Sequence, residues 1–305
     1  MNVNSYWEVN MVNKKVVIGV IVFFAILSLS MVYLGNLVKK EKNAETKSIE
    51  QNLIIVKEAK VLPENEGKLV LVNGETRRER VVVDDEFYMS YDSVKIYRKV
   101  EMVQWKLEET WNDRLEEYEY EYKLVWSEKH INNISRTSNE NYINPSEAAY
   151  KSKTFYNDVE IGDFKLSSEQ IKNIPTTGVI EKLDIEVADR IGMTITDKYY
   201  TNVKNGTPKK GDIRISFLVV DAKLYNEITI LAKQFKDSFE DFNADNGTKA
   251  GKMTNKVYDG ILSKSDVIND IKSEGSGYAT MFYVIAGLFL IPIVFTIKNN
   301  FFKKI

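Results

Sequence analysis

The sequence contains no cysteine, which excludes disulfide bonds, thiolate metal ligands and cysteine nucleophiles together. Its single histidine, His130, leaves no set of imidazoles for a multi-histidine zinc or iron site. It has neither a phosphate-binding P-loop pattern nor the glycine pattern of dinucleotide-binding proteins. With 42 basic and 44 acidic residues, it also lacks the positive charge that is typical of nucleic-acid binding. We therefore expect no metal, no cofactor and no nucleic-acid partner.

Charged residues are missing altogether from the segment Val16 to Val38. As a helix rising about 1.5 Å per residue, this segment is long enough to cross a hydrocarbon core of about 30 Å. A cleaved signal peptide is the alternative, because Lys14 and Lys15 precede the segment. The apolar core of a signal peptide is shorter and ends in a small-residue cleavage site, which is missing here. We predict an uncleaved transmembrane helix at 16–38.

A second uncharged segment, Tyr278 to Ile297, predicts a transmembrane helix at 278–297 that tolerates Pro292. Two spans put the tails 1–15 and 298–305 on one side of the membrane. The C-terminal tail has three lysines and no acidic residue, and the N-terminal tail has Lys14 and Lys15 against Glu8, so the positive-inside rule places both in the cytoplasm. The lysines at 39, 40 and 42 argue the other way, but long translocated domains follow the charge rule only weakly. We therefore expect residues 39–277 to form an extracytoplasmic domain. Neither span holds an ionisable residue that would suggest an ion pathway.

The domain between the spans reads mainly as antiparallel strands. The run Lys68 to Val72 predicts a strand that ends at a turn over Asn73 and Gly74. Alternating apolar and polar residues predict two hairpins, the first pairing 94–107 with 118–126 across a joining stretch at 108–117, the second pairing 212–220 with 225–235. We therefore expect an α+β fold, with a β-rich, mainly antiparallel extramembrane domain between two single transmembrane α-helices.

Short helices and a possible duplication complete the expected organisation. The charged stretch 39–50 suits a helix that continues out of the membrane, and helix-start signals predict three more helices, at 144–150, from Ser167, and over 265–273 with Ser265 as N-cap. A weak likeness between Gly67–Val72 and Gly211–Ser216 leaves open a division into two β-rich halves, at about 50–150 and 151–275.

Several patterns that could carry chemistry have simpler explanations. The stretch from Asp241 begins like a calcium-binding loop, but Asn246 and Lys252 occupy the positions that need glycine and glutamate, so a surface turn is favoured. His130 follows a predicted strand close to Glu128 with no nucleophile arranged around it, which favours an exposed residue over a catalytic one. The stretches 133–135 and 246–248 match the glycosylation sequon, which matters only in a eukaryotic secretory route.

Three tryptophans, Trp105, Trp111 and Trp126, are the best candidates for a partner surface. As core residues of the first hairpin they need no functional explanation. If they are exposed together, they form the kind of aromatic surface that protein partners bind.

The stretch 67–74, with the motif Val100-Glu101-Met102-Val103-Gln104-Trp105, resembles the transmembrane protein 43 family, also called LUMA. Further matches are Trp126-Ser127-Glu128, Asn144-Pro145-Ser146 and 211–217, so that the resemblance covers about 50–275. It implies a membrane protein of the endoplasmic reticulum or inner nuclear membrane in eukaryotes, with a luminal or exterior loop, which associates with itself and with other membrane proteins. Animal members have several spans after the loop, where this sequence has one. The absence of cysteine and the short tail predict a bacterial member in the cell membrane.

The favoured function is that of a non-enzymatic scaffold, anchored in membrane lipid, whose exterior domain binds itself or other membrane proteins. The first alternative is a sensor of an external ligand or of the envelope state, which passes its signal to a membrane partner. A hydrolase that uses two converging carboxylates is a further alternative, and it requires a cleft that sequence cannot reveal.

Overall fold

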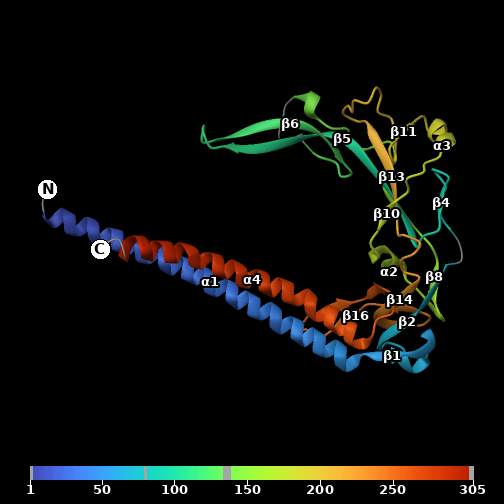
Figure 1. The fold of residues 1–305 in the computed structure, drawn as a ribbon, viewed down its shortest axis with the longest axis horizontal. Helices are drawn as coiled ribbons and strands as arrows, with labels where there is room; N and C mark the ends of the chain where they lie inside the picture. Colours follow the sequence, from blue (N-terminus) through green and yellow to red (C-terminus); the bar gives the residue numbers. More distant parts are fainter. Residues whose placement is uncertain (1–2, 79–80, 133–138, 302–305) are drawn as a thin grey trace.

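A computed structural model describes residues 3–78, 81–132 and 139–301, and it places a β-rich domain at one end of two long, paired helices (Figure 1). Helix α1 runs over Val3–Asn52 and helix α4 over Lys264–Phe301, with Pro292 inside it. Both are long and apolar enough to cross a membrane. The charged stretch 39–50 continues α1 as predicted, and α1 also includes most of the segment ahead of the first apolar run.

The two helices lie side by side and antiparallel (Figure 1). The Ser28 hydroxyl donates a hydrogen bond to the Ala286 carbonyl at 2.9 Å, and the Tyr283 hydroxyl donates to Asn36 Oδ1 at 2.9 Å. Gly35 lets the Tyr283 ring approach, since a Cβ there would lie 2.7 Å from that ring. Small residues and interhelical hydrogen bonds are what hold helices together in lipid. The pairing sets the two apolar segments alongside each other over their whole length.

The sheet next to the helices, which we call the proximal sheet, has the order β15-β14-β2-β8-β9, with β1 paired to β2 and β18 to β14. Alternate residues of β2 point to opposite faces, and both faces are covered. Val70 and Val72 face the main core, whereas Leu69 and Leu71 pack against Ile49 and other residues near the C-terminal end of α1 and the N-terminal end of α4. This double burial explains why the β2 sequence is a continuous apolar run. The strands are β1 Ile54–Val56, β2 Leu69–Arg78, β8 Val159–Ile161, β9 Phe164–Lys165, β14 Glu227–Phe235, β15 Ser238–Glu240 and β18 Lys256–Asp259.

The second sheet, which we call the distal sheet, has the order β11-β12-β13-β5-β6, with β10 paired to β13 and β7 to β5. One face carries a core in which Phe87, Tyr200 and Phe217 are fully buried, beneath helix α3 (Ile185–Arg190) and the small hairpin of β3 (Val82–Asp84) and β4 (Met89–Tyr91). The strands are β5 Lys95–Asn112, β6 Glu117–Ser127, β7 Lys153–Tyr156, β10 Gly178–Val179, β11 Thr194–Thr196, β12 Tyr199–Thr201 and β13 Ile213–Val219.

A buried ion pair ties the β3–β4 hairpin to the distal sheet. The Arg98 guanidinium on β5 donates to both carboxylate oxygens of Asp84, at 3.0 and 3.1 Å. The side chains are 4% and 1% exposed. Arg98 also lies over the Phe87 ring and donates to the Lys151 carbonyl, so its charge is enclosed on several sides.

The predicted fold class is confirmed, because two terminal apolar helices flank a β-rich domain in which every described strand pair except β1–β2 is antiparallel. Each sheet draws strands from both 50–150 and 151–275, so neither sheet corresponds to one of the two proposed halves. The predicted hairpin of 212–220 with 225–235 is wrong. Ile213 of β13 pairs with Met102 in the distal sheet, while Ile230 of β14 pairs with Val72 in the proximal sheet. Tyr225, at φ +57, lies where the chain changes sheets.

Three local predictions also need correction. Strand β2 continues through Asn73 and Gly74 instead of turning, because β14 pairs with it there and Ile161 packs closely on Gly74. The first hairpin is confirmed, but β5 extends to Asn112, so only residues 113–116 form the turn. No helix forms over 144–150, because the Asn144 side chain instead bonds the backbone of Trp105 and the Ile131 carbonyl.

The other short helices are close to expectation. Helix α2 (Ser168–Asn173) starts at Ser167 with a capping box completed by Gln170. Helix α4 begins one residue earlier than predicted, and the N-cap is Ser263 rather than Ser265, since the Ser263 hydroxyl accepts the Asp266 backbone N–H. The calcium-loop-like stretch forms the turn between β16 (Phe242–Ala244) and β17 (Lys252–Thr254), where Asp245 and Asn246 accept backbone N–H groups of the turn itself. The remaining elements are short 3₁₀ turns at Lys57–Ala59, Pro63–Asn65 and Glu140–Tyr142.

Candidate interaction surface

Strands β5 and β6 extend beyond the distal sheet as a two-stranded ribbon, formed by residues 106–123 (Figure 1). Strand β13 pairs with β5 only as far as Met102, and the Asn144 side chain bonds the backbone of Trp105 on the same edge. Beyond that point, no other strand of the described chain pairs with β5 or β6. The ribbon and the helix pair project from the same side of the domain, in the same general direction (Figure 1). The ribbon is therefore the most extended part of the domain.

The two faces of the ribbon differ in chemistry, because neighbouring side chains alternate between faces. The register pairs Trp105 with Leu124 and Trp111 with Tyr118, so the aromatic residues share one face. The Trp111 and Tyr118 rings meet edge to face with their centroids 5.0 Å apart. Trp111, Tyr118 and Tyr120 are 48%, 57% and 61% exposed. The opposite face carries charged side chains, including Lys123, which pairs with Glu108 at 2.9 Å and with Glu121 at 3.3 Å.

The three tryptophans of the predicted partner surface lie on this aromatic face, but their surroundings differ. Trp105 is half-buried, with its ring against Tyr142 at 5.2 Å between centroids. Trp126 is also half-buried beneath the Arg214 guanidinium, which lies 4.6 Å from the ring centroid. Arg214 in turn accompanies Glu101, with Nε donating to Oε2 at 2.8 Å. Trp111 alone of the three is exposed. Their role in binding a partner stays a prediction, which now concentrates on Trp111 and its tyrosine neighbours.

The ribbon is also strongly acidic, a feature that the net charge of the whole chain conceals. Between residues 108 and 121 there are seven acidic side chains against one basic side chain, Arg114, so this segment carries six net negative charges (1 − 7 = −6). A count of charge along the sequence in short windows would have revealed it. The acidic residues are Glu108, Glu109, Asp113, Glu116, Glu117, Glu119 and Glu121.

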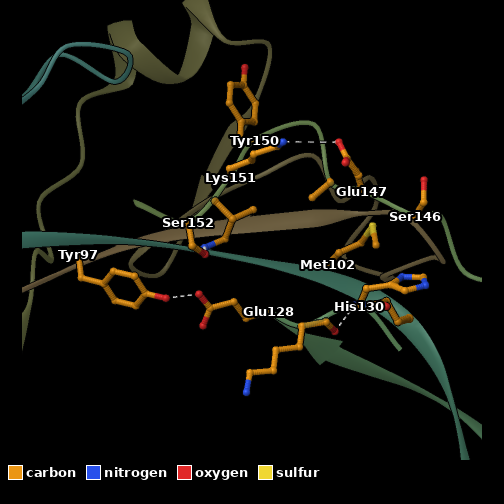
Figure 2. A pocket seen from close by; sticks show the side chains of 13 residues that line it. Tyr97, Met102, Glu128, His130, Ser146, Glu147, Tyr150, Lys151 and Ser152 are labelled. Atoms are coloured by element: carbon orange, nitrogen blue, oxygen red, sulfur yellow. Dashed lines mark hydrogen bonds and ion pairs between the residues drawn. The ribbon is translucent and has the colours of Figure 1, made fainter. Parts of the chain in front are cut away.

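A polar cleft of about 470 Å³ lies beside the base of β5 (Figure 2). On its floor the Tyr97 hydroxyl donates a hydrogen bond to the Glu128 carboxylate, and Lys151 faces Glu147 at 3.8 Å. Burial, with the Glu128 carboxylate beside it, raises the pKa of Tyr97 to about 12. Tyr97 therefore stays neutral at physiological pH. In the described part of the chain, no hydrogen bond joins the His130 ring to Ser146 or to Glu128, although all three residues line the cleft.

The structure describes the side chains that could hold a metal ion within residues 3–78, 81–132 and 139–301. No group of three or more histidine, aspartate or glutamate side chains in these ranges is arranged to hold a metal ion. The predicted glycosylation sequon at 133–135 lies outside the described residues, whereas Asn246 lies in the exposed β16–β17 turn.

The region of the chain that is similar to known proteins includes the ribbon, α4 and most of the residues that line the cleft. A family model described as Transmembrane protein 43 matches residues 102–305. The chain is 29% identical to Transmembrane protein 43 of Pongo abelii over 248 residues, which cover 73% of this chain and 60% of that protein. It is 28% identical to the Homo sapiens protein and 27% identical to that of Mus musculus, with the same shares covered. The chain thus spans 60% of the length of these relatives.

No solved structure matches the chain. The relatives named above are mammalian, so they lend no support to the predicted bacterial origin. The family match extends over most of the chain and includes the second apolar helix, and both apolar helices suit a bilayer. The chain belongs to the transmembrane protein 43 family and is a membrane protein.

Proposed function

We propose that this chain is a non-enzymatic, membrane-anchored interaction protein that uses the β5–β6 ribbon to bind other membrane proteins close to the bilayer. The observation that carries the proposal is the ribbon itself. A lone two-stranded ribbon is only marginally stable in water, and unpaired strand edges invite pairing with other chains. Exposed Trp111, Tyr118 and Tyr120 add the residue types that dominate the energy of protein interfaces.

The orientation of the ribbon supports a partner at the membrane. Because the ribbon and the helix pair project from the same side of the domain, a surface that meets the ribbon tip belongs to a neighbour near the bilayer (Figure 1). The six net negative charges of residues 108–121 favour a basic segment on that neighbour. Lys and Arg are enriched beside the cytoplasmic ends of membrane spans. A basic segment can also flank a span on the domain side, as Lys39, Lys40 and Lys42 do in this chain.

We also propose the topology of the chain. The apolar segments 16–38 and 278–297 serve as the spans, and the lysines at 14, 15, 298, 303 and 304 keep both tails in the cytoplasm. Residues 39–277 then lie outside the cytoplasm, or in the lumen of the endoplasmic reticulum or nuclear envelope in a eukaryote. Protease treatment of sealed vesicles tests this, because attack from the domain side should remove 39–277, and full protection would reverse the assignment.

Site-specific cross-linking of the full chain in native membranes tests the ribbon. A photoreactive residue in place of Tyr120 should give a discrete adduct, whereas the same residue at Ile185, which is 70% exposed on α3, should give none. An adduct of twice the chain's mass would identify the partner as a second copy. Equal yields at the two positions, or no adduct from Tyr120, would refute the proposal.

A charge variant with a matched control sharpens this test. Replacing Glu116, Glu117 and Glu119 by glutamine should lower the yield of the Tyr120 adduct severalfold, because the attraction to a basic partner is lost. The equivalent neutralisation of three exposed acids around α3, Glu181→Gln, Glu186→Gln and Asp189→Asn, should leave that yield unchanged.

The sensor alternative has one structural candidate, the cleft of Figure 2. Its volume of about 470 Å³ lies within the range of small-molecule sites, roughly 300–1,000 Å³. A polar ligand that binds there should stop protecting the chain against heat when Glu128 is changed to Gln. A ligand whose protection survives that change would bind elsewhere.

A further inference from the structure

A small cavity of about 180 Å³ lies between the two helices where they leave the apolar band. Three contacts between α1 and α4 determine the position of the cavity along the helices. The Tyr283 ring packs on Gly35, its hydroxyl donates to Asn36, and the stem of Lys42 crosses α4 at Gly275. These contacts place Val38 and Tyr278 at about the same position along the helix pair. These two residues are the ends of the apolar segments nearest the β-rich domain. The cavity thus begins within the apolar band and opens beyond it.

The lining of the cavity changes character along the helices. Ala279, Thr280 and Tyr283 line its deeper part within the apolar segment of α4. The outer part is lined by Lys39, Lys42 and Asn43 from α1, and by Lys272, Gly275 and Ser276 from α4. A bilayer's headgroup layers add about 10–15 Å in total to its hydrocarbon core, or a few residues of helix on each side. The outer lining therefore falls at the depth of lipid headgroups.

The charge of this lining is positive, with three lysines and no carboxylate among its residues. The Lys42 ammonium is already paired, with Glu45 at 3.0 Å and Glu274 at 3.6 Å. For Lys39 and Lys272, both exposed, the structure records no ion pair with any described residue. Lys39 and Lys272, neither of which is in an ion pair with a described residue, thus line one cavity together with Asn43 and Thr280.

Gly275 is what allows this arrangement. A Cβ at this position would lie 2.1 Å from Lys42 Cγ. With glycine there, the Lys42 stem lies against the α4 backbone, which brings its ammonium to Glu45 and Glu274. The ion pairs with Glu45 and Glu274 thereby hold the Lys42 ammonium, while Lys39 and Lys272 line the same cavity. The cavity volume of about 180 Å³ exceeds the roughly 30 Å³ that one water molecule occupies in the liquid.

We propose that this cavity, between Lys39 on α1 and Lys272 on α4, binds the phosphate-bearing headgroup of an anionic phospholipid. The two ammonium groups bind the headgroup charge, and the groove past Thr280 and Tyr283 admits the start of the acyl region. Basic pockets between transmembrane helices are suited to such headgroups. Free phosphate shares the charge chemistry but does not use the apolar part of the lining, so the assignment is to the lipid. The proposal does not depend on the function of the ribbon or on which side the domain faces.

Native mass spectrometry of the full chain in a nonionic detergent, titrated with phosphatidylglycerol, tests this site. Each lysine near an anionic headgroup strengthens binding by about fivefold, so the variant Lys39→Gln/Lys272→Gln should bind the lipid about 25-fold more weakly. The matched control Lys40→Gln/Lys47→Gln removes the same charge from exposed positions of α1 outside the lining, and it should bind within about twofold of the unmodified chain.

Two further arms decide the nature of the ligand. Phosphatidylcholine, which carries a phosphate but no net charge, should bind more weakly than phosphatidylglycerol, and millimolar inorganic phosphate should not displace the bound lipid. Equal losses in the test and control variants would overturn the proposal, because they would indicate diffuse surface attraction. Equal binding of the two lipids, displacement by inorganic phosphate, or an unchanged Lys39→Gln/Lys272→Gln variant would overturn it as well.

Discussion

Replacing Arg98 by methionine should be among the most damaging single changes in this chain. The substitution keeps much of the apolar stem but leaves the Asp84 carboxylate, which is 1% exposed, without its guanidinium. Removing one partner from a buried ion pair costs about 3–5 kcal/mol, because the other charge stays buried and uncompensated. For a domain of roughly 200 residues, each kcal/mol lowers the melting temperature by about 2–4 °C. We therefore expect the melting temperature to fall by about 6–20 °C.

The pH dependence of this loss separates the buried charge from a simple packing defect. Burial raises the pKa of Asp84 above its ordinary value, even with Arg98 beside it. Without Arg98 the pKa of Asp84 should rise further. When folding raises the pKa of a carboxyl, the protein loses stability as the pH rises through that pKa. The Arg98→Met variant should therefore lose less stability near about pH 5 than near about pH 8.

Thermal unfolding of the full chain in detergent, followed by tryptophan fluorescence, measures this effect. The double variant Arg98→Met/Asp84→Leu should regain most of the lost stability, since apolar replacement of both partners is often nearly neutral. Arg114→Met, in the exposed turn of the ribbon, serves as the control and should melt within about 2 °C of the unmodified chain. A pH-independent loss in Arg98→Met, or no recovery in the double variant, would refute the reasoning.

Three further predictions address other parts of the fold. Burial alone would raise the pKa of Glu101, but hydrogen bonds from Arg214 and Lys99 outweigh burial and lower that pKa. The substitution Glu101→Gln should therefore cost roughly 1.5–3 kcal/mol of stability near neutral pH. In thermal melts at decreasing pH, this difference should disappear as the Glu101 carboxylate of the unmodified chain becomes protonated. In a denaturant titration, Gly162→Ala should cost about 2–5 kcal/mol of stability, because Gly162 has φ +55 and a Cβ there would lie 2.3 Å from the Ala59 carbonyl oxygen. Gly247 also has a positive φ but has open space around it, so Gly247→Ala should cost only the strain of that backbone conformation, about 1–2 kcal/mol. In the cysteine-free chain, Ser28→Cys/Ala286→Cys should oxidise to a disulfide in membranes, and a failure to do so would contradict the antiparallel helix pairing.

The properties that depend on neighbouring residues could be read from the sequence. The two spans follow from uninterrupted apolar runs, and the β5–β6 hairpin follows from its alternation, because side chains two apart in a strand share a face. The capping box at Ser167 and Gln170 is likewise a local pattern. The family resemblance rested on the motif around Met102 and Trp105, and the family match begins at that motif.

Pairing partners and three-dimensional placement could not be read in this way. Sequence order suggested that β13 and β14 pair, yet each binds a strand more than 100 residues away in the chain (Met102 to Ile213, and Val72 to Ile230). Alternation specifies which face of a strand is apolar, but it does not specify which sheet the strand joins. The exposed state of Trp111, in contrast to half-buried Trp105 and Trp126, depends on the loop residue Tyr142 and on Arg214, which are distant in sequence.

The two features on which the proposals rest show the same division. The sequence by itself determined that the chain has two apolar helices, lysines flanking them and an acidic, tyrosine-rich hairpin, because composition and periodicity are local. Only the tertiary structure decided that Lys39 and Lys272 face one cavity, since this depends on the antiparallel register set by Ser28, Gly35 and Tyr283. It alone decided that the ribbon extends on the same side of the domain as the helices (Figure 1), because that direction results from how the distal sheet is joined to the proximal one.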